Sequence, residues 1–71
     1  MIVFVNEKEL VLFSGAKLAD ALLMHGDSTL AGVKSGRLYV LDRYGNRMNT
    51  SGALTEGGRY FVRTTENEKQ Q

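Results

Sequence analysis

The chain has 71 residues, which is enough for one small domain. It contains no cysteine and one histidine, which excludes disulfides, thiolate metal sites and paired-histidine metal sites. Nine basic and eight acidic residues nearly cancel, so no uniform field favours DNA or a membrane surface. The apolar runs are too short for a membrane span or a signal peptide, and we expect a cytoplasmic domain that does not bind a membrane.

The beginning of the sequence predicts a β-hairpin. Ile2–Val5 is β-branched and aromatic, and residues 9–13 form a second run of the same kind. The polar residues between the two runs predict the turn that joins them.

A helix is predicted after the hairpin, over residues 16–24. Ser14 can cap its first turn, and Gly26 is suited to end it. One apolar stripe with helical spacing runs along it and ends in a histidine: Leu18, Ala21, Leu22 and His25. A second, short helix is predicted over residues 29–34, ended by Gly36.

The remainder of the chain predicts three more strands, over residues 37–42, 47–49 and Arg59–Thr64. Leu54 stands alone among polar neighbours and predicts a loop anchored by one buried side chain. Residues 65–71 have no apolar side chain and predict a disordered tail after a domain of residues 1–64. The expected fold class is α+β, with a mixed sheet of four or five strands packed on one main helix.

This pattern resembles the ubiquitin-like β-grasp fold, and the ThiS/MoaD sulfur-carrier family within it. The resemblance rests on the hairpin at residues 2–13, the start of the helix at residues 14–18 and the closing element at residues 54–60. It implies the strand order 2-1-5-3-4. RNA-binding TGS domains share the same signatures.

The sequence departs from the sulfur carriers at two points. Those proteins end in Gly-Gly, whose carboxylate is adenylated, whereas this sequence ends in Gln71. They also commonly carry an aspartate at the position of Gly58. We therefore expect the fold without the sulfur chemistry, and a degenerate sulfur carrier remains an alternative.

No catalytic, cofactor-binding or metal-binding site is expected, and the chain is predicted not to be an enzyme. His25 is interpreted as a residue that interacts with the dipole at a helix C-terminus. The pair Gly57-Gly58 fits a tight turn and lacks the context of a phosphate-binding loop. The acidic residues share no short motif and are interpreted as solvated surface charge: Asp20, Asp27, Asp42 and Glu56.

Apolar residues occupy both faces of the predicted strands, although helices cover only one face of a β-grasp sheet. The register that suits the family directs eight residues toward the helix: Val3, Val5, Leu10, Leu12, Leu38, Val40, Tyr60 and Val62. The opposite face then displays Ile2, Phe4, Val11, Phe13, Tyr39, Leu41 and Phe61. Such a patch usually marks an interaction surface.

We expect this patch to bind another protein or a second copy of the chain, which makes the domain a protein-interaction module. The residues expected to make the contact are Phe4, Phe13, Tyr39, Phe61, Arg59 and Arg63. Partial cover of the patch by arginine side chains or by the tail is the alternative.

The basic residues gather in the second half of the sequence. Residues 34–63 carry six cations and two acids, a net charge of +4, with aromatic residues among them. A basic aromatic surface suits single-stranded RNA, through phosphate contacts and base stacking. A TGS-like RNA-binding module is therefore the alternative function.

Overall fold

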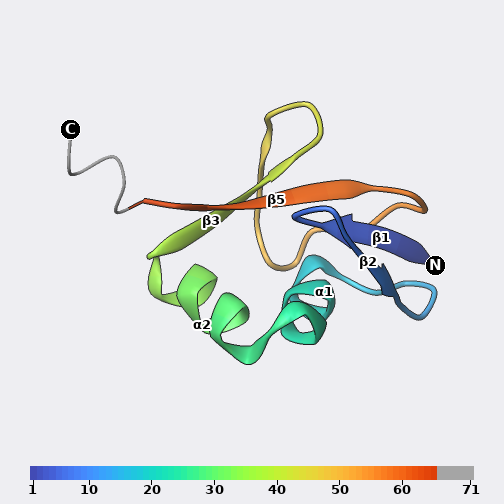
Figure 1. Ribbon diagram of the computed structural model, residues 1–71, viewed down its shortest axis with the longest axis horizontal. Coiled ribbons are helices and arrows are strands. Elements are labelled where there is room, and N and C mark those ends of the chain that lie inside the picture. Colours follow the sequence, from blue (N-terminus) through green and yellow to red (C-terminus); the bar gives the residue numbers. More distant parts are fainter. Residues whose placement is uncertain (66–71) are drawn as a thin grey trace.

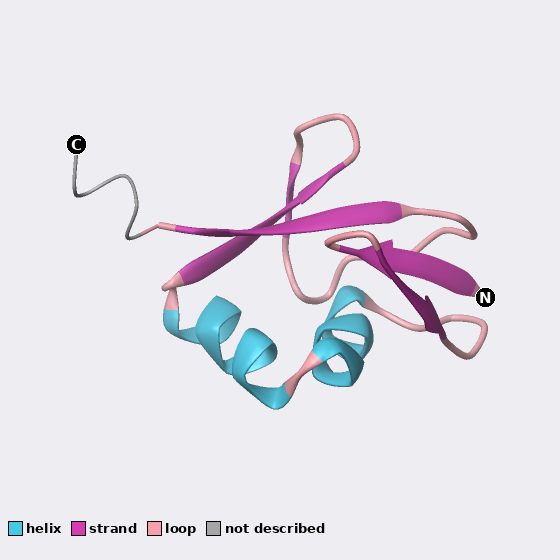
Figure 2. Cartoon of the chain, in the orientation of Figure 1, coloured by secondary structure: helices cyan, strands magenta, loops and turns pink. Residues whose placement is uncertain are grey.

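The computed structural model describes residues 1–65. In this part of the chain, five strands form one mixed sheet, and two helices lie against one side of it (Figures 1 and 2). The strands are β1 (Ile2–Val5), β2 (Lys8–Val11), β3 (Leu38–Asp42), β4 (Arg47–Met48) and β5 (Arg59–Thr64), and the helices are α1 (Leu18–His25) and α2 (Asp27–Ser35). The order in the sheet is β2-β1-β5-β3-β4, with β1 parallel to β5 and the other neighbours antiparallel. The α+β class and this strand order agree with the expectation.

The predicted hairpin of β1 and β2 forms, but its turn has two residues and not three, because β2 spans Lys8–Val11 instead of residues 9–13. The turn residues, Asn6 and Glu7, both have positive φ, at 49° and 68°, which matches the turns that suit the twist of a hairpin. The Asn6 side-chain oxygen accepts a hydrogen bond from the Val62 backbone N–H at 2.9 Å. The turn is therefore tied to β5 as well as to its own hairpin.

Helix α1 begins at Leu18, two residues later than expected, and the prediction that Ser14 caps it is wrong. The first N–H groups of the helix bond to a distant loop instead. Leu18 donates to the Gly52 carbonyl oxygen and Ala19 to that of Thr50, both at 2.9 Å. These carbonyl groups satisfy the donors that a capping side chain would otherwise satisfy.

The prediction of one main helix is also wrong, because α2 has nine residues and α1 has eight. Tertiary packing outweighs the weak helix propensity of α2. A Cβ atom at Gly32 would lie 2.5 Å from the Leu38 side chain, so glycine lets α2 approach β3 closely. Gly36 ends the helix with φ 90°, as expected.

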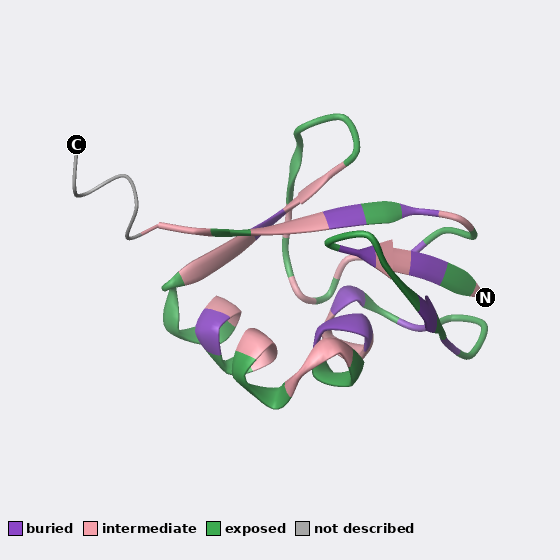
Figure 3. Ribbon diagram, viewed as in Figure 1, coloured by how far each residue is buried: buried purple, intermediate pink, exposed green. Residues whose placement is uncertain are grey.

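The core lies between the helices and the sheet (Figure 3). Six of the eight residues predicted to face the helices are buried, and Leu38 and Val62 are half-buried. Leu54 is also buried and anchors its loop, as predicted. The buried hydrophobic residues are Val3, Val5, Leu10, Leu12, Ala16, Leu18, Ala21, Leu22, Val40, Leu54 and Tyr60.

Thr65, the first residue of the expected tail, is bonded to the connection between α2 and β3. Its backbone N–H donates to the Arg37 carbonyl oxygen at 3.0 Å, and its hydroxyl group contacts the carbonyl oxygen of Gly36 at 3.2 Å. The end of β5 is therefore held against the start of β3. The remaining tail positions, 66–71, lie outside the described residues.

Candidate functional site

The side of the sheet opposite α1 and α2, called here the helix-free face, carries three aromatic side chains on adjacent strands. Strand alternation places Phe4 of β1, Phe61 of β5 and Tyr39 of β3 on this face, because their neighbours along each strand face the core. All three side chains are half-buried although α1 and α2 lie against the other side of the sheet (Figure 1).

An arginine lies over each of the three rings. The Cζ atoms lie 4.4 Å from the ring centroid for Arg59 over Phe4, 4.4 Å for Arg47 over Tyr39 and 5.3 Å for Arg63 over Phe61. Cation–π contacts of this kind contribute about 0.5–1 kcal/mol each at exposed sites. These six residues are called the arginine–aromatic layer. The arginines provide the partial cover considered as the alternative to a bare apolar patch.

The sheet register explains two of these contacts. Phe4 and Arg59 are direct neighbours across β1 and β5. Arg47 lies opposite Leu41 across β3 and β4, and so it is diagonal to Tyr39. Direct and diagonal neighbours on one face are the pairs within reach of aromatic and long side chains.

Arg47 belongs to the layer but was not among the six residues expected to make the contact. Its partner ring, Tyr39, was among them. Arg47 could not be assigned to this face from the sequence because the register of the hairpin formed by β3 and β4 was not known. In that register Leu41 pairs with Arg47. A turn fixed at residues 43–46 would have placed Arg47 on the helix-free face.

Phe13, by contrast, is not brought together with the other expected contact residues. It follows β2, two residues beyond Val11, and the pair of Val11 with Ile2 is itself two pairs away from that of Phe4 with Glu9. Phe13 is 62% exposed and Val11 is 66% exposed, and none of the three arginine–ring contacts among the described residues involves Phe13. The helix-free face thus has an arginine-covered part and a bare apolar part at β2.

The charge on the arginine-covered part is positive. Among the described strand residues, the helix-free face carries the three guanidinium groups of the layer and one carboxylate, that of Glu9, which lies opposite Phe4. A surface with this balance attracts anionic groups and repels cationic ones.

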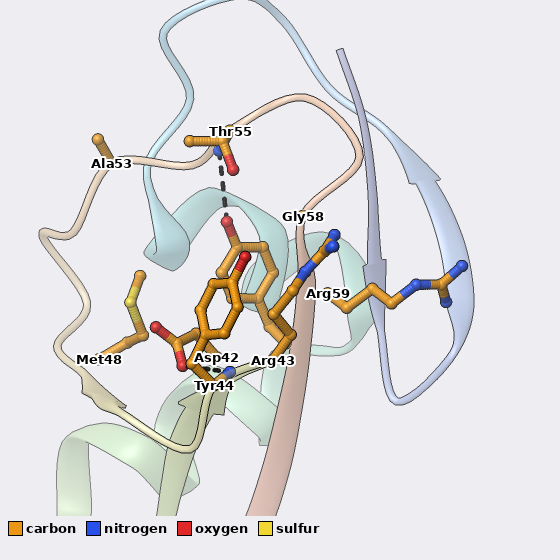
Figure 4. Close-up of a pocket in the computed structure, with 9 residues that line it drawn as sticks. Asp42, Arg43, Tyr44, Met48, Ala53, Thr55, Gly58 and Arg59 are labelled. Carbon is orange, nitrogen blue, oxygen red and sulfur yellow. Dashed lines mark hydrogen bonds between the residues drawn. The ribbon is translucent and has the colours of Figure 1, made fainter.

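A hollow of about 250 Å³ lies next to the layer, between the turn after β3 and the loop before β5 (Figure 4). Two of the polar side chains that line it bond to the backbone of the loop before β5. The Thr55 N–H donates to the Tyr60 hydroxyl oxygen at 3.3 Å, and Arg43 donates to the Gly57 carbonyl oxygen at 2.8 Å. These side chains hold the loop and the turn in place.

Asp42 holds the turn at the same hollow, and it is expected to make that turn pH-sensitive. Its carboxylate accepts the backbone N–H groups of Asn46 and Tyr44, both at 2.9 Å. The hydrogen bond from Asn46, followed by that from Tyr44, holds the pKa of Asp42 below its ordinary value. The stabilisation is therefore present above the ordinary pKa and is lost as the pH falls through the lowered pKa.

We expect an NMR titration to place the Asp42 pKa below that of an unstructured aspartate. The backbone N–H groups of Tyr44 and Asn46 are expected to lose protection against hydrogen exchange as Asp42 becomes protonated, because their acceptor is then neutral. Asp42→Asn serves as the control and removes that pH-dependent step. A titration at or above the ordinary value would contradict the prediction.

Two of the other acidic groups, and the histidine, also serve local structure. Asp20 accepts the Lys17 backbone N–H at 2.8 Å, and Glu56 accepts that of Ile2 at 3.0 Å. His25 Nδ1 lies 3.2 Å from the Thr29 hydroxyl oxygen and links α1 to α2.

Residues 1–65 hold no group of three histidine or acidic side chains placed to bind a metal ion. Neither helix of this region has the length and apolar character needed to cross a membrane.

Comparison with known proteins provides no identification: no protein-family model, curated protein or solved structure matches the chain.

Proposed function

We propose that this chain is a ubiquitin-like β-grasp domain that acts as a non-enzymatic protein-interaction module and binds an acidic partner protein on its helix-free face. The observation that carries the proposal is the arginine–aromatic layer, in which three rings and three guanidinium groups cover adjacent strands.

The arrangement of the sheet supports the β-grasp part of the proposal. The order β2-β1-β5-β3-β4, with β1 parallel to β5, is the order that the resemblance to ThiS/MoaD proteins implies. Helices on one side of the sheet leave the other side available to a partner (Figure 1).

The layer is suited to carboxylates on a protein surface. Each guanidinium group presents a planar fork of donors that matches a carboxylate with two parallel hydrogen bonds. Contact with a ring restricts the arginine side chain before binding, which lowers the entropy lost when the pair forms. Aromatic and arginine residues are also the usual energetic centres of protein interfaces.

The charge of the layer favours such a partner over the same face of a second copy. Two helix-free faces packed against each other would bring six guanidinium groups together with only the two Glu9 carboxylates to offset them. Like charges placed together at an interface cost several kcal/mol, which disfavours this face-to-face dimer.

Single-stranded RNA is the second candidate, and the guanidinium planes are the observation that favours it, since bases stack on them. Platforms for single strands, however, stack bases on open aromatic rings. Here each ring of the layer is half-buried and lies beneath a guanidinium group. The geometry therefore favours carboxylates over bases.

The test compares Arg59→Glu with Arg37→Glu. Both substitutions change the charge by the same amount, but Arg59 lies over Phe4, whereas the Arg37 side chain lies beside Gly32 of α2 on the helix side. The probe is a ten-residue glutamate-rich peptide, titrated into isotopically labelled protein. We expect peak shifts at residues of the layer, and a loss of affinity of about tenfold or more in Arg59→Glu only.

A uridine decanucleotide titrated under the same conditions distinguishes the two candidates. Affinity for the oligonucleotide that exceeds that for the peptide, falls steeply with salt and is lost in Arg59→Glu would replace our proposal by RNA binding. Equal loss of peptide affinity in both variants would also overturn it, because the effect would then follow net charge and not the layer.

A further inference from the structure

Strand β2 forms one edge of the sheet, and its outer backbone groups have no partner strand within residues 1–65. Met1 and Leu12 exchange both of their N–H···O bonds, at 2.8 and 2.7 Å. In an antiparallel pair, such residues alternate with residues whose groups point away from the partner strand. Glu9 and Val11 of β2 therefore direct their N–H and C=O groups outward, away from β1.

This edge lacks two features that commonly protect edge strands. The chain has no proline, and the pairing of β1 with β2 is one-to-one over four residues, without a bulge. Lys8 shares the helix side of the strand with Leu10, so it leaves the helix-free side of the edge uncharged except at Glu9. The edge at β4, by comparison, is only two residues long.

Bare apolar side chains lie beside these unpaired backbone groups. Val11 is 66% exposed and its cross-strand neighbour Ile2 is 37% exposed. A row of apolar side chains beside unpaired backbone groups is the surface that an added strand continues, because that strand satisfies both. We propose that two copies of this chain pair antiparallel through β2, with Leu10 opposite Leu10 of the second copy.

The sequence of β2 is complementary to itself in this register. Glu9 pairs with Val11 of the second copy and Val11 with Glu9, which satisfies all the outward backbone groups of β2 with four hydrogen bonds. The same pairing places each Glu9 beside a valine and each Lys8 opposite Leu12, so no like charges lie directly opposite each other. A two-fold axis relates the copies, as in most dimers of identical chains.

The pairing leaves the arginine–aromatic layer open. The axis runs perpendicular to the sheet, so the two layers lie on the same side of one continuous ten-strand sheet. The inference is thus independent of the acidic partner proposed above, and its failure can be told apart from a failure of that proposal.

Sedimentation over a range of concentrations tests the pairing. We expect a dimer whose dissociation constant rises by about tenfold or more in Val11→Lys, because a lysine on the edge opposes strand addition. Leu23→Lys is the matched control, since Leu23 is also exposed, at 51%, but lies on α1. Amide exchange at Glu9 and Val11 is expected to slow as the concentration of protein rises.

The register is tested by disulfide formation, which the absence of native cysteine makes simple to read. Paired Cα atoms in this register lie about 5.5 Å apart, within the range of a disulfide. Glu9→Cys and Val11→Cys chains are therefore expected to cross-link to each other faster than to themselves. Faster self-linking of Val11→Cys would overturn the register.

A monomer at every concentration, with unprotected amides at Glu9 and Val11, would overturn the pairing. So would a dimer that survives in Val11→Lys but dissociates in Arg59→Glu, because its contact would lie on the helix-free face.

Discussion

Val5→Asp is expected to unfold the domain. Val5 is fully buried in β1, at 0% exposure, and packs in a core in which no charged side chain of residues 1–65 is buried. A carboxylate there would lose its hydration without gaining a partner, which is among the few changes that cost more than about 4 kcal/mol. Circular dichroism and urea denaturation measure the result.

Phe4→Asp, one residue earlier in the same strand, is the matched control. Phe4 is half-buried on the helix-free face, beneath the Arg59 guanidinium group. The new carboxylate would remain hydrated next to that cation, so we expect a loss of about 1–3 kcal/mol, from the buried part of the ring and its cation–π contact, and the domain stays folded. Unfolding by Phe4→Asp with tolerance of Val5→Asp would mean that the register of β1 is shifted by one residue.

Gly58→Ala is expected to lower the free energy of unfolding by about 1–3 kcal/mol, the usual cost of adding a methyl group to a well-packed core. A Cβ atom at this position would lie 2.5 Å from the Tyr60 hydroxyl oxygen and 2.9 Å from two carbons of its ring. Tyr60 is buried and cannot move aside easily. The measurement is denaturant unfolding of both proteins.

A double-mutant cycle attributes the effect to the ring. In a Tyr60→Val background, Gly58→Ala is expected to cost at least about 1 kcal/mol less, since residues in contact do not behave additively. An equal cost in both backgrounds would assign the effect to the backbone. The same contact gives a packing reason for glycine at position 58.

The inward side of the sheet could be predicted from the sequence because it depends on local alternation. Val3, Val5 and Val40 follow this alternation and are fully buried. Leu54 could be predicted for a similar reason, since one large apolar residue in a polar loop has few stable places other than the core.

The limits of α1 and α2 could not be predicted, because they depend on residues distant in the sequence. The first turn of α1 bonds to the carbonyl groups of Thr50 and Gly52, which lie more than thirty positions away. The length of α2 depends on the contact of Gly32 with Leu38 of β3. Intrinsic propensity carries no information about either contact.

The aromatic residues of the candidate site could be predicted from the sequence, but the positions of its arginine side chains could not. The aromatic residues of the layer follow from alternation along β1, β3 and β5. The position of each guanidinium group depends on which strand lies beside which, and the place of Arg47 depends on the register of β3 with β4.

The parallel pairing of β1 with β5 also determines when this sheet can form. The two strands lie side by side in the sheet but near opposite ends of the described chain, and they are joined through Phe4 N–H to Gly58 and Asn6 N–H to Tyr60. During synthesis, the hairpins β1–β2 and β3–β4 leave the ribosome first, without the strand that joins them. Contacts between such distant segments are slow to form. A nascent chain that stops before Arg59 would therefore lack the strand that joins β1 to β3, and a lone two-stranded hairpin is only marginally stable, so no smaller version of the sheet is expected to form.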